Sequence, residues 1–133
     1  MANSPLEMNL ADVAALLRQK QLSPVELTEQ SLARIAALNP RLNALLTVTA
    51  EAALTEARQA ESEINKGEYR GPLHGVPVTV KDLMFTAGVR TTCGSKIMAN
   101  FVPDYDATVV KKLREAGAVG VDRKSTRLNS SHT

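Results

Sequence analysis

The chain has 133 residues, of which 44% are hydrophobic and 23% charged, so it suits one small globular domain or part of a larger one. These values exclude collagen-like and wholly disordered chains, and no apolar run approaches the roughly 18 residues of a membrane span. The single cysteine excludes an internal disulfide and a cysteine-rich zinc site, and the 3% aromatic content argues against stacking platforms for single-stranded nucleic acid.

The net charge of +2 arises at the end of the chain. Residues 122–133 contain three basic and one acidic side chain, whereas the rest of the chain contains 13 of each. We therefore expect no nucleic-acid surface. Residues 1–9 lack the basic and apolar segments of a signal peptide, so we expect a cytoplasmic protein with no membrane partner.

Two helices are predicted in the first third of the chain. Asn9 can cap the first helix, with Asp12 at its third position. The second helix has a stronger start, because Ser23 suits the N-cap, the following proline suits the first helical position and Glu26 suits the third. We expect Pro40 to end this second helix.

The middle of the chain passes from helices to alternating strands and loops. Residues 42–49 are short, apolar and β-branched, which indicates a strand or an extended segment. The alanine- and glutamate-rich residues 50–66 indicate a third helix, and Gly67 suits the position just past its end. A turn-rich loop at residues 71–75 then leads into a buried strand over residues 76–80.

The last part of the chain is predicted to continue this pattern. After a loop, we expect a short helix at residues 95–101 and a longer helix over residues 107–116. Asp106 can cap the longer helix. Three of its apolar side chains should face inward: Val109, Val110 and Leu113. Residues 118–121 begin another strand. This order is typical of an α/β domain with parallel strand pairing.

Lys81 is the residue with the clearest chemical potential. It follows the apolar strand directly and precedes Asp82. A lysine that is removed from water has a lowered pKa and can serve as a general base near neutral pH. More often, a lysine at a strand end reaches solvent and pairs with a neighbouring acid, which here is Asp82. The residue types alone favour the second interpretation.

Other side chains are weaker candidates. His74, in the loop before the strand, is expected to make a local hydrogen bond or to be exposed, and the two histidines lack the spacing of metal ligands. Cys93 is expected to be a small loop or core residue. Three hydroxyl groups either line a substrate pocket or serve as turn and cap residues, with the second use slightly favoured: Thr91, Thr92 and Ser95.

The segment GPLHGVPVTVKDL, residues 71–83, resembles the lysine motif of the amidase signature family. The similarity covers about residues 8–121. It includes four further segments: LSPVEL (22–27), TAGVRTTCGS (86–95), DYDATVV (104–110) and LREAGA (113–118).

The resemblance implies an α/β fold in which N-terminal helices precede the first strands of a mixed sheet, with helices on both sides. Here that fold is incomplete. The resemblance also implies a hydrolase that cleaves carboxylic amides with a Ser/cis-Ser/Lys triad and no metal or organic cofactor, with Lys81 as the lysine. In that family the two serines lie further along the chain, so we expect this chain to be inactive by itself. The expected partner is a small-molecule amide.

Two alternatives stay open. The same motifs fit the A-subunit of the tRNA-dependent amidotransferase, which would need companion subunits. In a different class, the chain is a non-catalytic small module or an artefactual open reading frame.

Residues 122–133 form the last predicted feature. They show no apolar periodicity and resemble translated adapter sequence, so we expect residues 1–121 to be the N-terminal part of the family domain and residues 122–133 to be a non-native tail. The strand at residues 76–80 would be central in the complete sheet. We therefore expect exposed sheet edges and a loosely folded or aggregating product.

Overall fold

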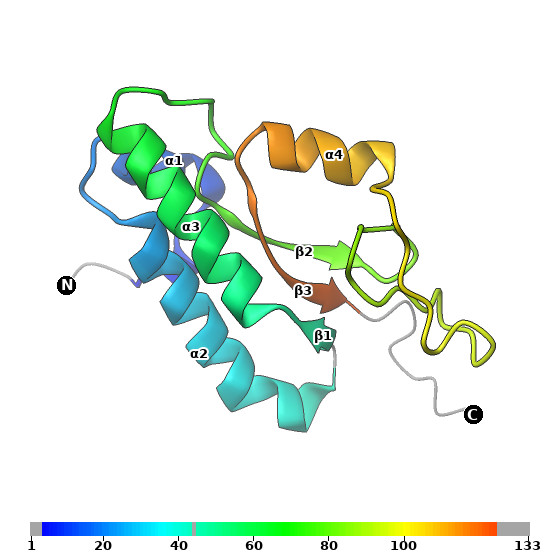
Figure 1. Cartoon of the computed structure of the whole chain (residues 1–133). Coiled ribbons are helices and arrows are strands. Elements are labelled where there is room, and N and C mark those ends of the chain that lie inside the picture. The colour runs from blue at the N-terminus through cyan, green and yellow to red at the C-terminus, as the bar shows by residue number, and fades with distance from the viewer. Residues whose placement is uncertain (1–3, 44, 125–133) are drawn as a thin grey trace.

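The computed structural model of the chain describes residues 4–43 and 45–124. It has an α/β architecture, with a small sheet between layers of helices (Figure 1). The helices are η1 (Pro5–Glu7), α1 (Leu10–Arg18), α2 (Pro24–Leu42), α3 (Ala50–Asn65) and α4 (Thr108–Glu115). The strands are β1 (Leu45–Val48), β2 (Pro77–Lys81) and β3 (Val119–Lys124).

The sheet is mixed and has the strand order β1-β3-β2. β2 and β3 run parallel, with Pro77 opposite Val119, whereas β1 and β3 run antiparallel, with Val48 opposite Asp122. The predicted parallel pairing is therefore confirmed. β3 is the central strand, and β2 has a strand neighbour on one side only among the described residues. Asp122 and the two residues after it continue β3, and residues 125–133 of the predicted tail lie outside the described residues.

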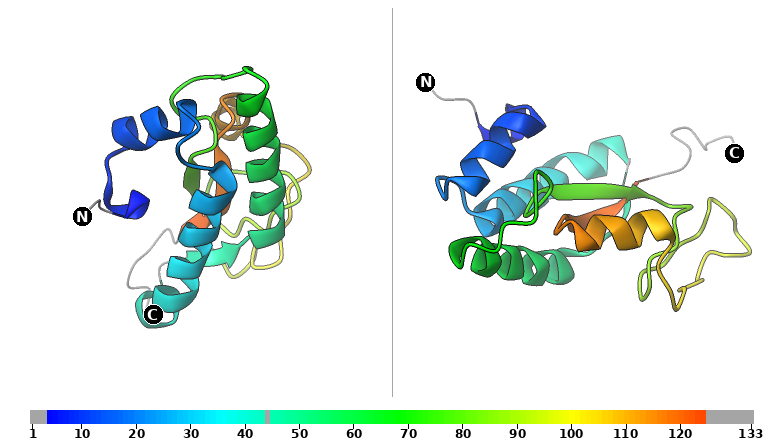
Figure 2. Two further views of the ribbon diagram at one scale, coloured as in Figure 1. Left: turned by 90° about the vertical axis from the view of Figure 1, so that its left-hand side faces the viewer. Right: turned by 90° about the horizontal axis from the view of Figure 1, so that it is seen from above.

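Helices cover both faces of the sheet, as the resemblance implied (Figure 2). Strand alternation explains this arrangement, because successive side chains point to opposite faces. Val78 and Val80 face α3 and α4, whereas Pro77 and Thr79 face α2 and η1. The core has two clusters. Ala53, Ala57, Val119 and Val121 are buried together between α3 and β3, with side chains of α2 packed against them. A second cluster joins α1 and α2 to the residue before β2: Val13, Leu17, Leu22, Leu27 and Val76. Small alanines on α3 allow that helix to pack closely against the sheet.

The predicted starts of α1 and α2 are confirmed. The Asn9 side chain accepts a hydrogen bond from the Asp12 N–H at 2.9 Å. The Ser23 hydroxyl oxygen accepts hydrogen bonds from the Val25 and Glu26 N–H groups at 3.1 and 3.3 Å. These bonds satisfy N–H groups that have no partner within the first turn of a helix.

The prediction that Pro40 ends α2 is wrong. The helix continues to Leu42 and ends at Asn43, which has a left-handed conformation with φ of 54°. Pro40 lies in the last turn, where its missing N–H removes only one backbone bond. The Asn39 side chain stabilises this turn by bonding both the N–H and the carbonyl of Leu45, at 2.9 and 3.0 Å.

The long connection from β2 to α4 also differs from the prediction. Residues 95–101 form a loop with turns instead of a short helix. Ile97 is 97% exposed, so its side chain does not hold a helix against the rest of the molecule. Asp106 does not cap α4. Its Oδ1 instead accepts the Ala87 N–H at 2.8 Å, and Ala107 is the N-cap without a side-chain bond. Val109, expected to be buried, is 43% exposed.

Within residues 4–43 and 45–124, no helix combines the length and apolar character needed to cross a membrane.

Candidate active site

Lys81 is the last residue of β2 and its side chain is exposed. Its backbone pairs with β3 opposite Lys124, and its carbonyl accepts the Met84 N–H at 3.0 Å, which begins the turn that leaves the sheet. Among the described residues, no side chain or backbone group forms a hydrogen bond or ion pair with the Lys81 amine. Lys81 lies at the carboxyl end of a parallel strand, where α/β folds commonly bind ligands.

Asp82 does not pair with Lys81. Its side chain is 1% exposed, and its Oδ1 accepts the Thr92 N–H at 3.0 Å. Its Oδ2 accepts a hydrogen bond from the Thr92 hydroxyl. The Asp82 carbonyl also accepts the Cys93 N–H at 2.8 Å. Residues 82 and 92–93 therefore close a loop directly beside Lys81, and the interpretation of Lys81 as the ion-pair partner of Asp82 is wrong.

The three hydroxyl residues act within this loop. The Thr91 hydroxyl donates to the Val89 carbonyl at 3.0 Å, and Thr91 is fully buried. The Ser95 hydroxyl oxygen accepts the Ile97 N–H at 3.2 Å. With Thr92 bonded to Asp82, all three make turn bonds, as the slightly favoured interpretation expected. Cys93 is a half-buried loop residue, as predicted, and has a left-handed φ of 53°.

His74 is a buried anchor of the loop that precedes β2. Its Nδ1 accepts the Arg70 N–H at 3.0 Å, so the ring proton lies on Nε2, which is 2.8 Å from Glu63 Oε1. Arg70 also bonds Glu63 at 2.8 Å and donates to the Arg114 and Glu115 carbonyls at the end of α4. The prediction of local hydrogen bonding is confirmed, and this network connects α3, the loop and α4.

The charge of Glu63 is stabilised by its donors. A hydrogen bond from the Gln59 amide, together with those from His74 and Arg70, holds the pKa of the Glu63 carboxyl below its ordinary value, although burial acts in the opposite direction. Nothing in the sequence marked Glu63 as a partner of His74, because the two residues belong to different elements.

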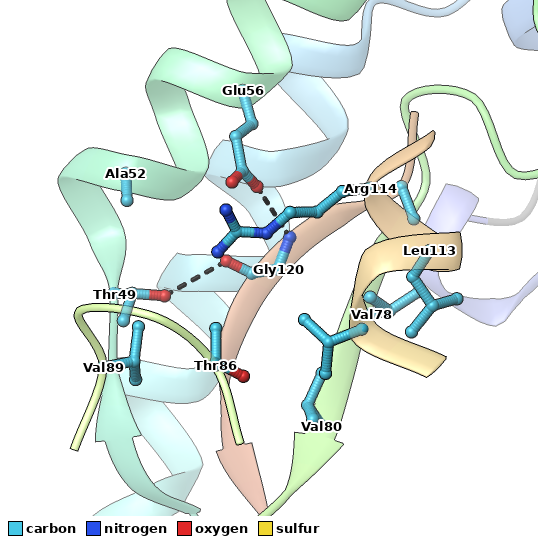
Figure 3. A pocket seen from close by; sticks show the side chains of 12 residues that line it. Thr49, Ala52, Glu56, Val78, Val80, Thr86, Val89, Leu113, Arg114 and Gly120 are labelled. Carbon is cyan, nitrogen blue, oxygen red and sulfur yellow. Dashed lines mark hydrogen bonds between the residues drawn. The ribbon is translucent and has the colours of Figure 1, made fainter. Parts of the chain in front are cut away.

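An apolar pocket lies along β2 on the face covered by α3 and α4 (Figure 3). Val78 and Val80 form one wall, and Leu113 closes it from α4. Two polar side chains at the pocket bond the backbone of β3: Glu56 accepts the Gly120 N–H at 3.0 Å, and Thr49 donates to the Gly120 carbonyl at 3.1 Å. These two bonds take the place of strand pairing on the β1 side of Gly120, where the chain beside β3 passes from β1 into α3.

A lysine can act as a general base near neutral pH where it is removed from water, and the side chain of Lys81 is exposed in this chain. The comparisons define the class: a family model described as Amidase matches residues 26–125, and the chain belongs to this family.

Individual relatives agree with this assignment. The chain is 48% identical over 112 residues to the A-subunit of glutamyl-tRNA(Gln) amidotransferase from Carboxydothermus hydrogenoformans, covering 84% of this chain and 23% of that protein. It is 50% identical over 117 residues to the protein of the same name from Geobacter sulfurreducens, covering 88% of this chain and 24% of that protein. The X-ray structure of native peptide amidase from Stenotrophomonas maltophilia matches with a TM-score of 0.83 and 40% identity, over 89% of this chain and 24% of that one. The chain thus spans about a quarter of the length of these relatives.

Proposed function

We propose that this chain is the lysine-bearing part of an amidase signature enzyme that hydrolyses carboxylic amides, with Lys81 as its general base. The observation that carries the proposal is the position of Lys81 at the carboxyl end of β2, which pairs in parallel with β3, with its amine unengaged by the described residues. Its side chain is exposed in this chain, and the rest of the enzyme would have to cover it and so remove the amine from water. Membership of the amidase family and the fold shared with a peptide amidase support the reaction class.

The proposed chemistry needs a neutral amine and two serines. Lys81 would take a proton through a bridging serine, which activates the nucleophilic serine towards the amide carbonyl. Backbone N–H groups near the nucleophile would stabilise the tetrahedral oxyanion. The acyl-enzyme would then be hydrolysed to a carboxylic acid, after release of ammonia or an amine. Both serines would come from the part of the enzyme that this chain does not contain.

The alternative is that the parent protein is the A-subunit of a tRNA-dependent amidotransferase. Relatives 48% and 50% identical to this chain carry that name. Companion subunits would then be its partners, in addition to a small-molecule amide. Affinity purification of the complete protein from its own cells separates the two: stoichiometric companion subunits favour the amidotransferase, whereas a lone active hydrolase favours the amidase. A cytoplasmic location is part of either proposal.

Genomic DNA across the codons for Val121 and Asp122 is the first test. We propose that residues 1–121 belong to the family domain and that residues 122–133 are not native. A frame that runs on past Val121 into a glycine- and serine-rich segment agrees with this, and it supplies the complete enzyme. A confirmed stop codon soon after Thr133 contradicts it. The chain would then be a non-catalytic module or an artefactual reading frame, and the amidase proposal fails.

The complete enzyme then tests Lys81 directly. Lys81→Ala should lower kcat/KM for amide hydrolysis about 10³-fold, because general acid–base catalysis contributes roughly 10²–10⁴-fold. Lys111→Ala is the matched control, since Lys111 is an exposed lysine on α4, and it should retain the wild-type rate. Wild-type activity in Lys81→Ala would show that Lys81 is not the base.

A further inference from the structure

We propose that Asp82 is a positioning residue for Lys81, acting through the turn at Thr92 and Cys93. This inference rests on the proposed function of Lys81. The position of Asp82 next to Lys81 in the sequence suggested an ion pair, whereas the Asp82 carboxylate bonds Thr92.

The bonds of Asp82 form a clamp at the base of a loop. Its carboxylate accepts the Thr92 N–H at 3.0 Å and the Thr92 hydroxyl, and its carbonyl accepts the Cys93 N–H at 2.8 Å. Thr92 Oγ1 in turn accepts the Gly94 N–H at 3.2 Å. One residue therefore holds both the side chain and the backbone of a turn ten positions further along the chain.

The burial of Asp82 makes this clamp rigid. Burying a carboxylate that is 1% exposed costs free energy unless the group is hydrogen-bonded. Losing the bonds to Thr92 would therefore destabilise the fold, which favours the closed turn. Cys93 is held in a left-handed conformation that residues other than glycine seldom adopt. The hydrogen bonds of the Cys93 N–H to Asp82 and of the Gly94 N–H to Thr92 compensate for that strain.

The clamp acts on Lys81 because Lys81 and Asp82 share a peptide bond. On one side, the Lys81 backbone is fixed by pairing with β3. On the other side, Asp82 is fixed by Thr92 and Cys93, and the Lys81 carbonyl accepts the Met84 N–H. The direction of the Lys81 Cα–Cβ bond is thus set from both sides, and a proton-transfer group requires such a defined starting geometry.

The first experiment uses the 133-residue chain and does not depend on activity. Cys93 is the single cysteine and lies in the clamped turn, so its rate of reaction with 5,5′-dithiobis(2-nitrobenzoate) reports how often the turn opens. Asp82→Asn and Thr92→Val should raise this rate about 10-fold or more, because local opening controls access to a half-buried group. Thr92→Ser keeps the hydroxyl and should react at the wild-type rate, as should Asp104→Asn, which changes an exposed aspartate. Equal rates in all five proteins overturn the proposal.

The second experiment uses the complete enzyme obtained from the gene. Asp82→Asn and Thr92→Val should lower kcat about 10²-fold with little change in KM, because misplacing a catalytic group costs about that much. Thr92→Ser should retain near wild-type kcat, which a general loss of folding would not explain. Faster Cys93 reaction with unchanged kcat overturns the positioning role alone. A wild-type enzyme that hydrolyses no amide overturns the proposed function, and the positioning role falls with it.

Discussion

Nε2 of His74 lies 2.8 Å from Oε1 of Glu63, and this contact joins the loop before the lysine strand to α3. The ring is fully enclosed, with Gly117 at the end of α4 against one edge. The start of β2 is therefore positioned from two helices at once. Since β2 ends in Lys81, the contact contributes to the geometry of the candidate site from the opposite end of the strand.

Close packing against His74 predicts that Gly117 tolerates no side chain. A Cβ added there would lie 2.3 Å from His74 Cδ2, and the backbone φ is +81°. Gly67 follows α3 with a similar φ of +86° and open space around it, so it isolates the backbone effect. In urea unfolding at low micromolar concentration, Gly67→Ala should lower the free energy of unfolding by about 1 kcal/mol and Gly117→Ala by about 3 kcal/mol. Equal losses would contradict the contact.

The hydrogen bonds to Glu63 predict a dependence of stability on pH. A carboxyl whose pKa is lower in the folded than in the unfolded chain stabilises the fold above its ordinary value, here 4.5. That contribution is lost as the pH falls through the folded-state value. Between pH 6 and pH 3, Glu63→Gln should therefore lose less stability than the wild type in urea unfolding. Glu29→Gln on α2 is the control and should follow the wild-type curve, and parallel curves for all three proteins would refute the role of Glu63.

The open edges of the sheet predict self-association of the 133-residue chain. β1 and β2 each have a strand neighbour on one side only within the described part of the chain. Leu83, Ile97 and Val102 add exposed apolar side chains in the loop beyond β2. Light scattering should show aggregation that rises with concentration, because unpaired strand edges and apolar patches favour association.

A charge at the exposed loop tests which surface drives this association. Ile97→Lys should reduce aggregation, whereas Gln19→Lys adds the same charge at an exposed position after α1 and should not. A monodisperse monomer with a cooperative thermal transition at high concentration would show that the open strand edges do not cause self-association.

The features that the sequence predicted well are those decided within a few residues. The Asn9 and Ser23 caps each involve N–H groups two or three positions away, so residue types alone specify them. The apolar run before Lys81 likewise predicted that this residue lies at the end of a strand. The order of strand, loop, helix and strand also predicted the parallel pairing of β2 with a strand some forty residues later.

The predictions that failed are those in which another hydrogen bond overrode a strong local tendency. Asp106 has the right position to cap α4, yet its carboxylate bonds the Ala87 N–H, nineteen residues earlier in the chain. Pro40 has a strong local tendency to end a helix, but Asn39 bonds Leu45 across the turn and the last turn persists. The Asp106 bond is a tertiary contact, whereas the Asn39 bonds are local ones that helix propensity does not take into account.

By itself, the sequence determined the caps of α1 and α2, the strand that carries Lys81 and the family to which its motifs belong, because these depend on neighbouring residues and on a specific motif. Only the tertiary structure decided that Asp82 bonds Thr92 instead of Lys81, and that His74 is buried against Glu63. A buried carboxylate or imidazole must find hydrogen-bond partners, and the path of the chain in three dimensions determines which partners lie within reach.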